Sequence, residues 1–141
     1  MTTTPPCSLR GGNALDNHEA PPPYDLADDT PTPQYLEANA WGMHHLDPVS
    51  WKFYLPIFIA YALSNISNPK AAAIDTFLFS LRPPDRDPPR LGSLSPHERS
   101  AVVALLDKLA FDSISVWKEG AITALEEYWA PGALYSGTRE T

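Results

Sequence analysis

The apolar segment 46–63 constrains the fold more than any other part of the chain. Asp47 can cap a helix by accepting hydrogen bonds from its first backbone N–H groups, and Pro48 suits the first helical position. Pro56 removes one backbone donor inside the same helix, which predicts a bend. Because apolar residues surround the axis, other helices must cover this one on most sides. The segment therefore predicts a kinked central helix from Pro48 to about residue 65.

Further helices are predicted on both sides of the central one. Three segments begin with a capping residue followed by proline, and each is followed by apolar residues at helical spacing. The first segment ends at a glycine, Gly42, and the third carries a full capping box. A last helix presents a face of tryptophan, tyrosine and alanine side chains and ends at Pro131. The three starts are Thr32-Pro33, Asn68-Pro69 and Ser95-Pro96.

The fold class that follows is all-α, a compact bundle of about five helices around the kinked one. No stretch shows the alternation and β-branched enrichment of a strand. The proline-rich segment 82–91 is predicted to be an exposed, stiff loop. Residues 1–31 hold many prolines and few apolar anchors, so we expect a disordered or irregular tail there. The expected division is a tail over 1–31, one domain over 32–131 and a second tail over 132–141.

Acidic charge is concentrated in the first 50 residues. They hold seven acidic side chains and one basic one, Arg10, and thus −6 of the net charge of −7. This balance argues against nucleic acid and against anionic membrane surfaces, since both require clustered Lys and Arg. The uncharged run after Lys52 is also shorter than the roughly 20 residues that a membrane span needs. An acidic lead segment is either a solvating tail or a landing surface for a basic partner.

Cysteine usage points to a compartment. The single cysteine, Cys7, has no partner for an intramolecular disulfide, and the first 13 residues lack the pattern of a signal peptide. We therefore expect a cytoplasmic protein.

Several motifs taken together resemble those of a known family. They lie between Trp41 and Trp129 and resemble, in order and spacing, a family of small bacterial domains of unknown function. The resemblance implies an all-helical domain and supplies no activity, substrate or catalytic residue. The motifs are LDPxxWKFYLPxxxxYAL, FLFSLRPP, LSP and ALEEYW.

Histidines are the natural candidates for catalysis or metal binding. His44 and His45 are adjacent, so their side chains point in different directions and rarely reach one ion, and Asp47 is needed as a cap. His97 lies in the first turn of a predicted helix without an identifiable nucleophile. We predict no metal site and no cofactor, and no catalytic residue can be named. A small hydrolase or a metal-dependent enzyme using His44, His45 or His97 remains the alternative function.

The leading interpretation is a non-enzymatic domain that binds a protein partner, as an immunity or accessory protein would. It is based on the acidic surplus, the abundance of interface-type aromatic residues and the lack of a catalytic motif. A helical homodimer with a structural role is a third possibility. The acidic lead segment favours a basic partner. The residues expected to bind it are Asp25, Asp28, Asp29, Trp41, His44 and His45.

Overall fold

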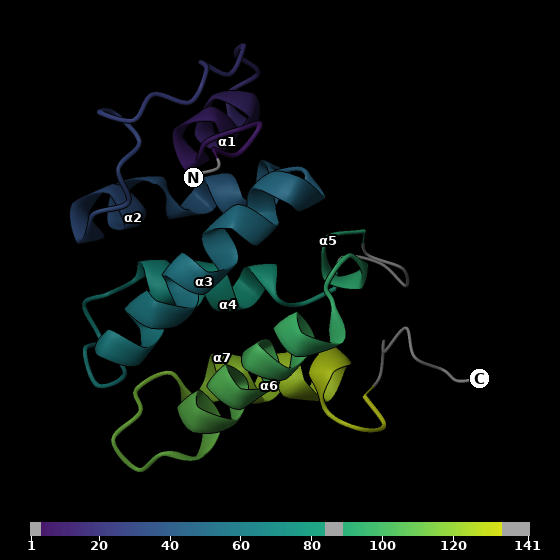
Figure 1. Cartoon of the computed structure of the whole chain (residues 1–141). Helices are drawn as coiled ribbons and strands as arrows, with labels where there is room; N and C mark the ends of the chain where they lie inside the picture. Colours follow the sequence, from purple (N-terminus) through teal and green to yellow (C-terminus); the bar gives the residue numbers. More distant parts are fainter. Residues whose placement is uncertain (1–3, 84–88, 134–141) are drawn as a thin grey trace.

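A computed structural model describes residues 4–83 and 89–133, and every regular element in these ranges is helical (Figure 1). The all-α prediction is confirmed. Figure 1 places α1 and α2 at one end of the molecule and α6 with α7 at the other, with α3 and α4 between them. The elements are α1 (Leu9–Asp16), α2 (Pro33–Asn39), the 3-10 helix η1 (Ala40–His45), α3 (Pro48–Ser64), α4 (Ala73–Ser80), α5 (Pro89–Gly92), α6 (Pro96–Phe111), α7 (Lys118–Ala124) and the π-helix η2 (Leu125–Trp129).

Helix α3 supplies the centre of the core. Its Trp51, Tyr54 and Phe58 side chains are fully buried, and the Phe58 ring stacks on Phe77 of α4 with 5.1 Å between centroids. The helix continues through Pro56, as the sequence predicts. Pro56 lies on an exposed side of the helix, where water can satisfy the carbonyl group that the missing N–H leaves without a partner.

Three of the predicted helix starts are present with their caps. The side chain of Thr32 accepts a hydrogen bond from the backbone N–H of Tyr35, and Asp47 accepts one from Ser50. Ser95 and Glu98 form the full capping box of α6. These signals act over three residues, so they can be identified without knowledge of the tertiary structure.

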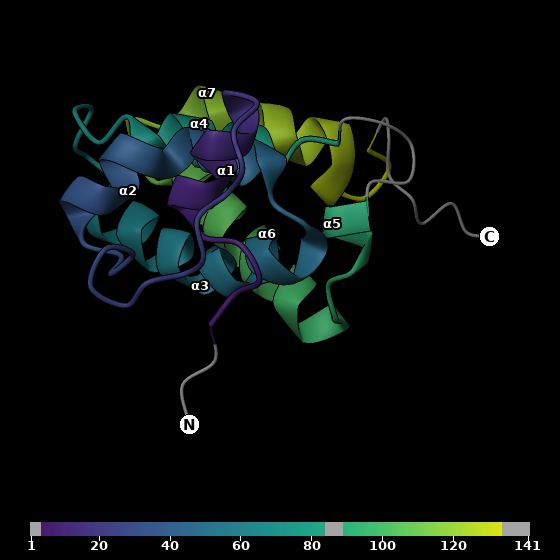
Figure 2. The same ribbon diagram turned by 90° about the horizontal axis from the view of Figure 1, so that it is seen from above.

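The expectation of an irregular segment over residues 1–31 is wrong for residues 9–16, which form α1, whereas residues 17–31 contain turns and no helix. Figure 2 looks down on this helix, and Leu9 at its start is completely buried. Other helices satisfy its first N–H groups: the N–H of Leu9 donates to the Tyr54 hydroxyl and that of Arg10 to the Tyr35 hydroxyl, at 3.2 and 3.1 Å. Local sequence could not indicate these two partners, because they come from distant residues. Ser8 is a local cap of the same helix, since its side chain accepts from the N–H of Gly11 at 2.8 Å.

The predicted start of the third helix is also corrected. Asn68 accepts a hydrogen bond from the N–H of Lys70 and so forms a turn, and α4 begins only at Ala73. The N–H of Ala73 donates to Glu37 of α2 at 3.0 Å. A carboxylate 36 residues earlier in the chain therefore takes the role expected of Asn68.

The predicted exposed loop over 82–91 is corrected at its end. Residues 89–92 form the short helix α5, and Leu91 on it is only 1% exposed. An apolar anchor inside a proline-rich segment is enough to dock that end on the core. Residues 84–88 of this loop lie outside the described ranges.

No helix in the described part of the chain has the length and apolarity needed to cross a membrane.

Candidate functional site

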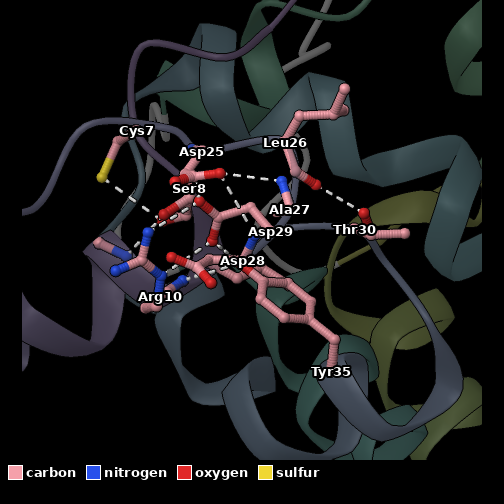
Figure 3. A network of polar contacts seen from close by, with 12 residues as sticks. Cys7, Ser8, Arg10, Asp25, Leu26, Ala27, Asp28, Asp29, Thr30 and Tyr35 are labelled. Atoms are coloured by element: carbon pink, nitrogen blue, oxygen red, sulfur yellow. Dashed lines mark hydrogen bonds and ion pairs between the residues drawn. The ribbon is translucent and has the colours of Figure 1, made fainter.

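The acidic residues predicted to bind a partner fall into two groups. Asp25 and Asp28 are exposed, whereas Asp29 is completely buried. Figure 3 shows Asp29 surrounded by polar groups: Arg10 donates to its carboxylate from Nε and Nη2 at 3.2 and 3.0 Å, and the Tyr35 hydroxyl donates at 2.6 Å. The expectation that Asp29 contributes to an exposed acidic surface is therefore wrong.

The electrostatics of Asp29 explain how a carboxylate is kept in the interior. Burial alone would raise the pKa of Asp29. The hydrogen bonds from Arg10 and Tyr35 lower this pKa by more than burial raises it, so it lies below the ordinary value. A buried, paired carboxylate holds the segment 25–29 against α1.

Trp41 and His44, both predicted partner-binding residues, lie in a row of aromatic side chains that contact one another with tilted and edge-on rings. The ring of His44 lies 4.4 Å from that of Trp41 and 5.2 Å from that of Phe79, between centroids. The guanidinium of Arg82 lies 5.2 Å from the Phe79 ring centroid. Trp41 and Phe79 both contact the His44 ring, and each is 52% exposed. Two large aromatic surfaces therefore face the solvent, and the Arg82 cation lies over one of them.

A groove of about 500 Å³ adjoins this row, and we call it the aromatic groove. It runs between η1, α4 and α7. Its exposed carboxylates are Asp75 and Glu119, and no ion pair joins either of them to another described residue. The lining residues are Trp41, Asp75, Thr76, Leu78, Phe79, Arg82, Glu119, Gly120 and Thr123.

A smaller cavity of about 140 Å³ shares Phe79 and Arg82 with the aromatic groove, and we call it the arginine pocket. Arg82 donates from Nε and Nη2 to the two carboxylate oxygens of Glu127, at 2.9 and 2.6 Å. Arg90 donates from Nη1 to the backbone carbonyl of Met43 at 2.6 Å. The lining residues are His44, Phe79, Ser80, Arg82, Pro83, Arg90 and Glu127.

His44 has an unusual environment in this pocket. Among the described residues its Nε2 is the only buried side-chain nitrogen or oxygen without a hydrogen-bond partner. Burial lowers the pKa of His44, and the positive charge of Arg90 lowers it further, so both effects favour the neutral imidazole. A buried polar atom without a partner is costly. His44 also lines the arginine pocket, so this atom lies close to a cavity that could hold a ligand.

The other candidate histidines lie apart from this row. His45, although adjacent in sequence, points toward α1 and contacts the carboxylate of Asp16 at 2.9 Å. His97 is exposed in the first turn of α6. In the residues that the structure describes, no three histidine, cysteine or acidic side chains gather closely enough to hold a metal ion.

Six residues that give these two cavities their charge and aromatic surface were not among the site residues predicted from the sequence: Asp75, Phe79, Arg82, Arg90, Glu119 and Glu127. The sequence offered a signal only for Phe79. It follows Phe77 and Leu78, which lie on the buried face of α4, so helical spacing places Phe79 outside that face. Arg82 and Glu127 are 45 residues apart, so only the tertiary structure brings them together.

Comparison with known proteins gives a family without an activity. No curated protein and no solved structure matches the chain. The sequence model of a family described as a family of unknown function, DUF6714, matches residues 1–133. The match extends over α1 and over both cavities, and it agrees with the expectation of a domain family of unknown function. The chain belongs to the DUF6714 family of unknown function.

Proposed function

We propose that this protein is a binding domain that docks a basic, apolar peptide segment of a protein partner in the aromatic groove. The observation that carries the proposal is the pair of half-exposed aromatic side chains, Trp41 and Phe79, at the rim of a groove that also contains two carboxylates. Large aromatic residues on a surface are typical anchors of protein interfaces.

Charge complementarity selects the chemistry of the partner. Asp75 and Glu119 give the groove a negative charge, whereas Arg82 is already paired with Glu127. A lysine or arginine of the partner can approach these carboxylates and stack its cation on the Trp41 face. Apolar neighbours of that cation would cover Phe79 and the wall formed by Leu78.

The rest of the surface favours the same partner. The exposed carboxylates of Asp25 and Asp28 add to the net charge of −7, which attracts basic segments and speeds encounter. We propose the cytoplasm as the compartment, which the single cysteine supports.

Selection of peptides tests this function. A random peptide library is panned on the full chain, and the enriched peptides are synthesised and titrated by calorimetry. We expect enrichment of lysine or arginine next to apolar residues. The Trp41→Ala variant should bind these peptides about tenfold or more weakly, because an anchor residue contributes roughly 2 kcal/mol.

A matched control removes another exposed aromatic side chain. Phe111 is 71% exposed and lines a different groove, between α6 and η2. The Phe111→Ala variant should bind the selected peptides as the parent does. Enrichment of acidic peptides, or unchanged affinity of the Trp41→Ala variant, would contradict the proposed function.

A further inference from the structure

We propose that the arginine pocket is a binding site for a single carboxylate group, held by Arg90 and the imidazole of His44 next to the Arg82–Glu127 pair. Three independent features of the described residues support this site: two guanidinium groups on one small cavity, a buried imidazole nitrogen without a partner, and a volume suited to a small group.

The first step concerns charge. The pocket is lined by the guanidinium groups of Arg82 and Arg90 and by the carboxylate of Glu127. Its net charge is therefore +1, in a protein whose net charge is −7. One bound negative charge neutralises the pocket, whereas a phosphate dianion would leave an excess of negative charge close to Glu127. The charge balance thus favours a carboxylate over a phosphate.

The second step concerns hydrogen bonds. Arg90 donates one of its five N–H groups to the carbonyl of Met43 at 2.6 Å, which fixes the guanidinium at the pocket wall. A carboxylate in the cavity accepts from the remaining N–H groups in the planar fork that guanidinium groups form. The Arg82–Glu127 pair, with bonds of 2.9 and 2.6 Å, shows the same fork within this pocket.

The third step concerns His44. Its ring is held between Trp41 and Phe79, and its Nε2 makes no hydrogen bond to any described residue. Nε2 is closed to water in this structure, so a carboxylate reaches it only after a small movement of the ring. In the tautomer that carries its proton on Nε2, the neutral imidazole then donates a hydrogen bond to a carboxylate oxygen. A bound carboxylate would thus give a hydrogen-bond partner to the one buried polar side-chain atom that lacks one among the described residues.

Two sources can supply such a carboxylate: a free small organic acid, or the carboxyl terminus of a peptide that lies in the adjoining aromatic groove. The two cavities share Phe79 and Arg82, so an apolar substituent of the acid can extend past Phe79 into the groove. The carboxylate site itself does not depend on the proposed partner, because acetate alone can occupy it.

The test observes the imidazole nitrogen directly. The full chain, labelled with ¹⁵N, is titrated at pH 7.5 with acetate, with inorganic phosphate, and with N-acetyl-lysyl-leucine and its carboxamide. We expect acetate to shift the His44 Nε2 resonance in a saturable way and to bind more tightly than phosphate. If the peptide acid binds more tightly than acetate and than its carboxamide, the source is a peptide terminus. If it binds no more tightly than acetate, the source is a free acid.

Variants separate a specific site from general attraction of anions. Arg90→Gln should weaken acetate binding about tenfold, because it removes a charge-assisted hydrogen bond. Lys70→Gln removes the same charge from an exposed position and should leave binding unchanged. Arg90→Lys keeps the charge without the fork and should give an intermediate affinity. Thermal melts of each variant show that it is folded.

Three results would overturn the carboxylate site: no saturable shift of His44 in the parent protein, tighter binding of phosphate than of acetate, or equal loss of acetate binding in Arg90→Gln and Lys70→Gln. The peptide selection is kept separate by synthesising the enriched peptides with amidated ends, so that their binding depends on Trp41 and not on a terminal carboxylate. The two proposals can therefore fail separately.

Discussion

Replacing Gly12 by alanine is expected to separate α1 from η1 and to lower the free energy of unfolding by about 3 kcal/mol. A Cβ atom at position 12 would overlap the carbonyl oxygen of Gly42 and lie 2.8 Å from its carbonyl carbon. The obstacle is backbone, so no side chain can rotate away to relieve the overlap. The Leu9 side chain, which is completely buried in the parent protein, would become exposed to water. Denaturant unfolding followed by circular dichroism measures the loss.

The same contact is restricted from the other side. A Cβ atom at Gly42 would overlap the carbonyl oxygen of Leu9 and lie 3.0 Å from its carbon. Gly42→Ala should therefore destabilise the protein by a similar amount. The double variant should lose less than the sum of the two single losses, because either change alone already separates the two elements.

Gly92→Ala is the matched control for this prediction. Gly92 ends the short helix α5, and nothing lies within 4 Å of a Cβ atom built there. The substitution should change the unfolding free energy by less than about 0.5 kcal/mol. Equal midpoints of unfolding for Gly12→Ala and Gly92→Ala would show that α1 does not pack on η1.

Replacing Asp29 by asparagine is expected to cost about 2 kcal/mol, because it removes a buried carboxylate that accepts hydrogen bonds from Tyr35 and the partly exposed Arg10. Arg10 would lose the carboxylate that accepts its Nε and Nη2, and the Asp29 side chain is completely inaccessible to compensating water. Asp28→Asn removes the same charge one residue away on an exposed position and should change stability by less than about 0.5 kcal/mol. Urea unfolding at pH 7 compares the two variants.

The pH dependence of this difference follows from the lowered pKa of Asp29. In the unfolded chain an aspartate titrates near about 4, and in the folded chain Asp29 titrates below that value. Its contribution is therefore complete above about pH 4 and is lost as the pH falls through the folded pKa. The stability gap between the parent and Asp29→Asn should shrink on acidification, whereas the gap to Asp28→Asn should stay small. A gap that is constant down to acid unfolding would contradict the assignment of Asp29 as an ionised, paired group.

Features that depend on neighbours in sequence were predictable. The caps at Thr32, Asp47 and Ser95 act within three residues, and each is present in the structure. Apolar residues lie on all sides of the α3 axis, which required burial of this helix on most sides. Its Trp51, Tyr54 and Phe58 do form the centre of the core. Helix α1 was missed because Gly11 and Gly12 are poor helix formers, and a local argument counts them against a helix.

By itself, the sequence determined that the chain is helical, where most helices begin and which helix is central, because these properties depend on hydrogen bonds and periodicity within a few turns. Only the tertiary structure decided that α1 belongs to the core, that Asp29 is buried and that Arg82, Arg90 and His44 share a pocket. The contacts responsible join residues far apart in the chain: Arg10 and Asp29 across 19 positions, Arg82 and Glu127 across 45, and Arg90 and Met43 across 47. Pairings at such separations depend on how the helices pack against one another. They cannot be predicted from hydrogen bonds and periodicity within a few helical turns.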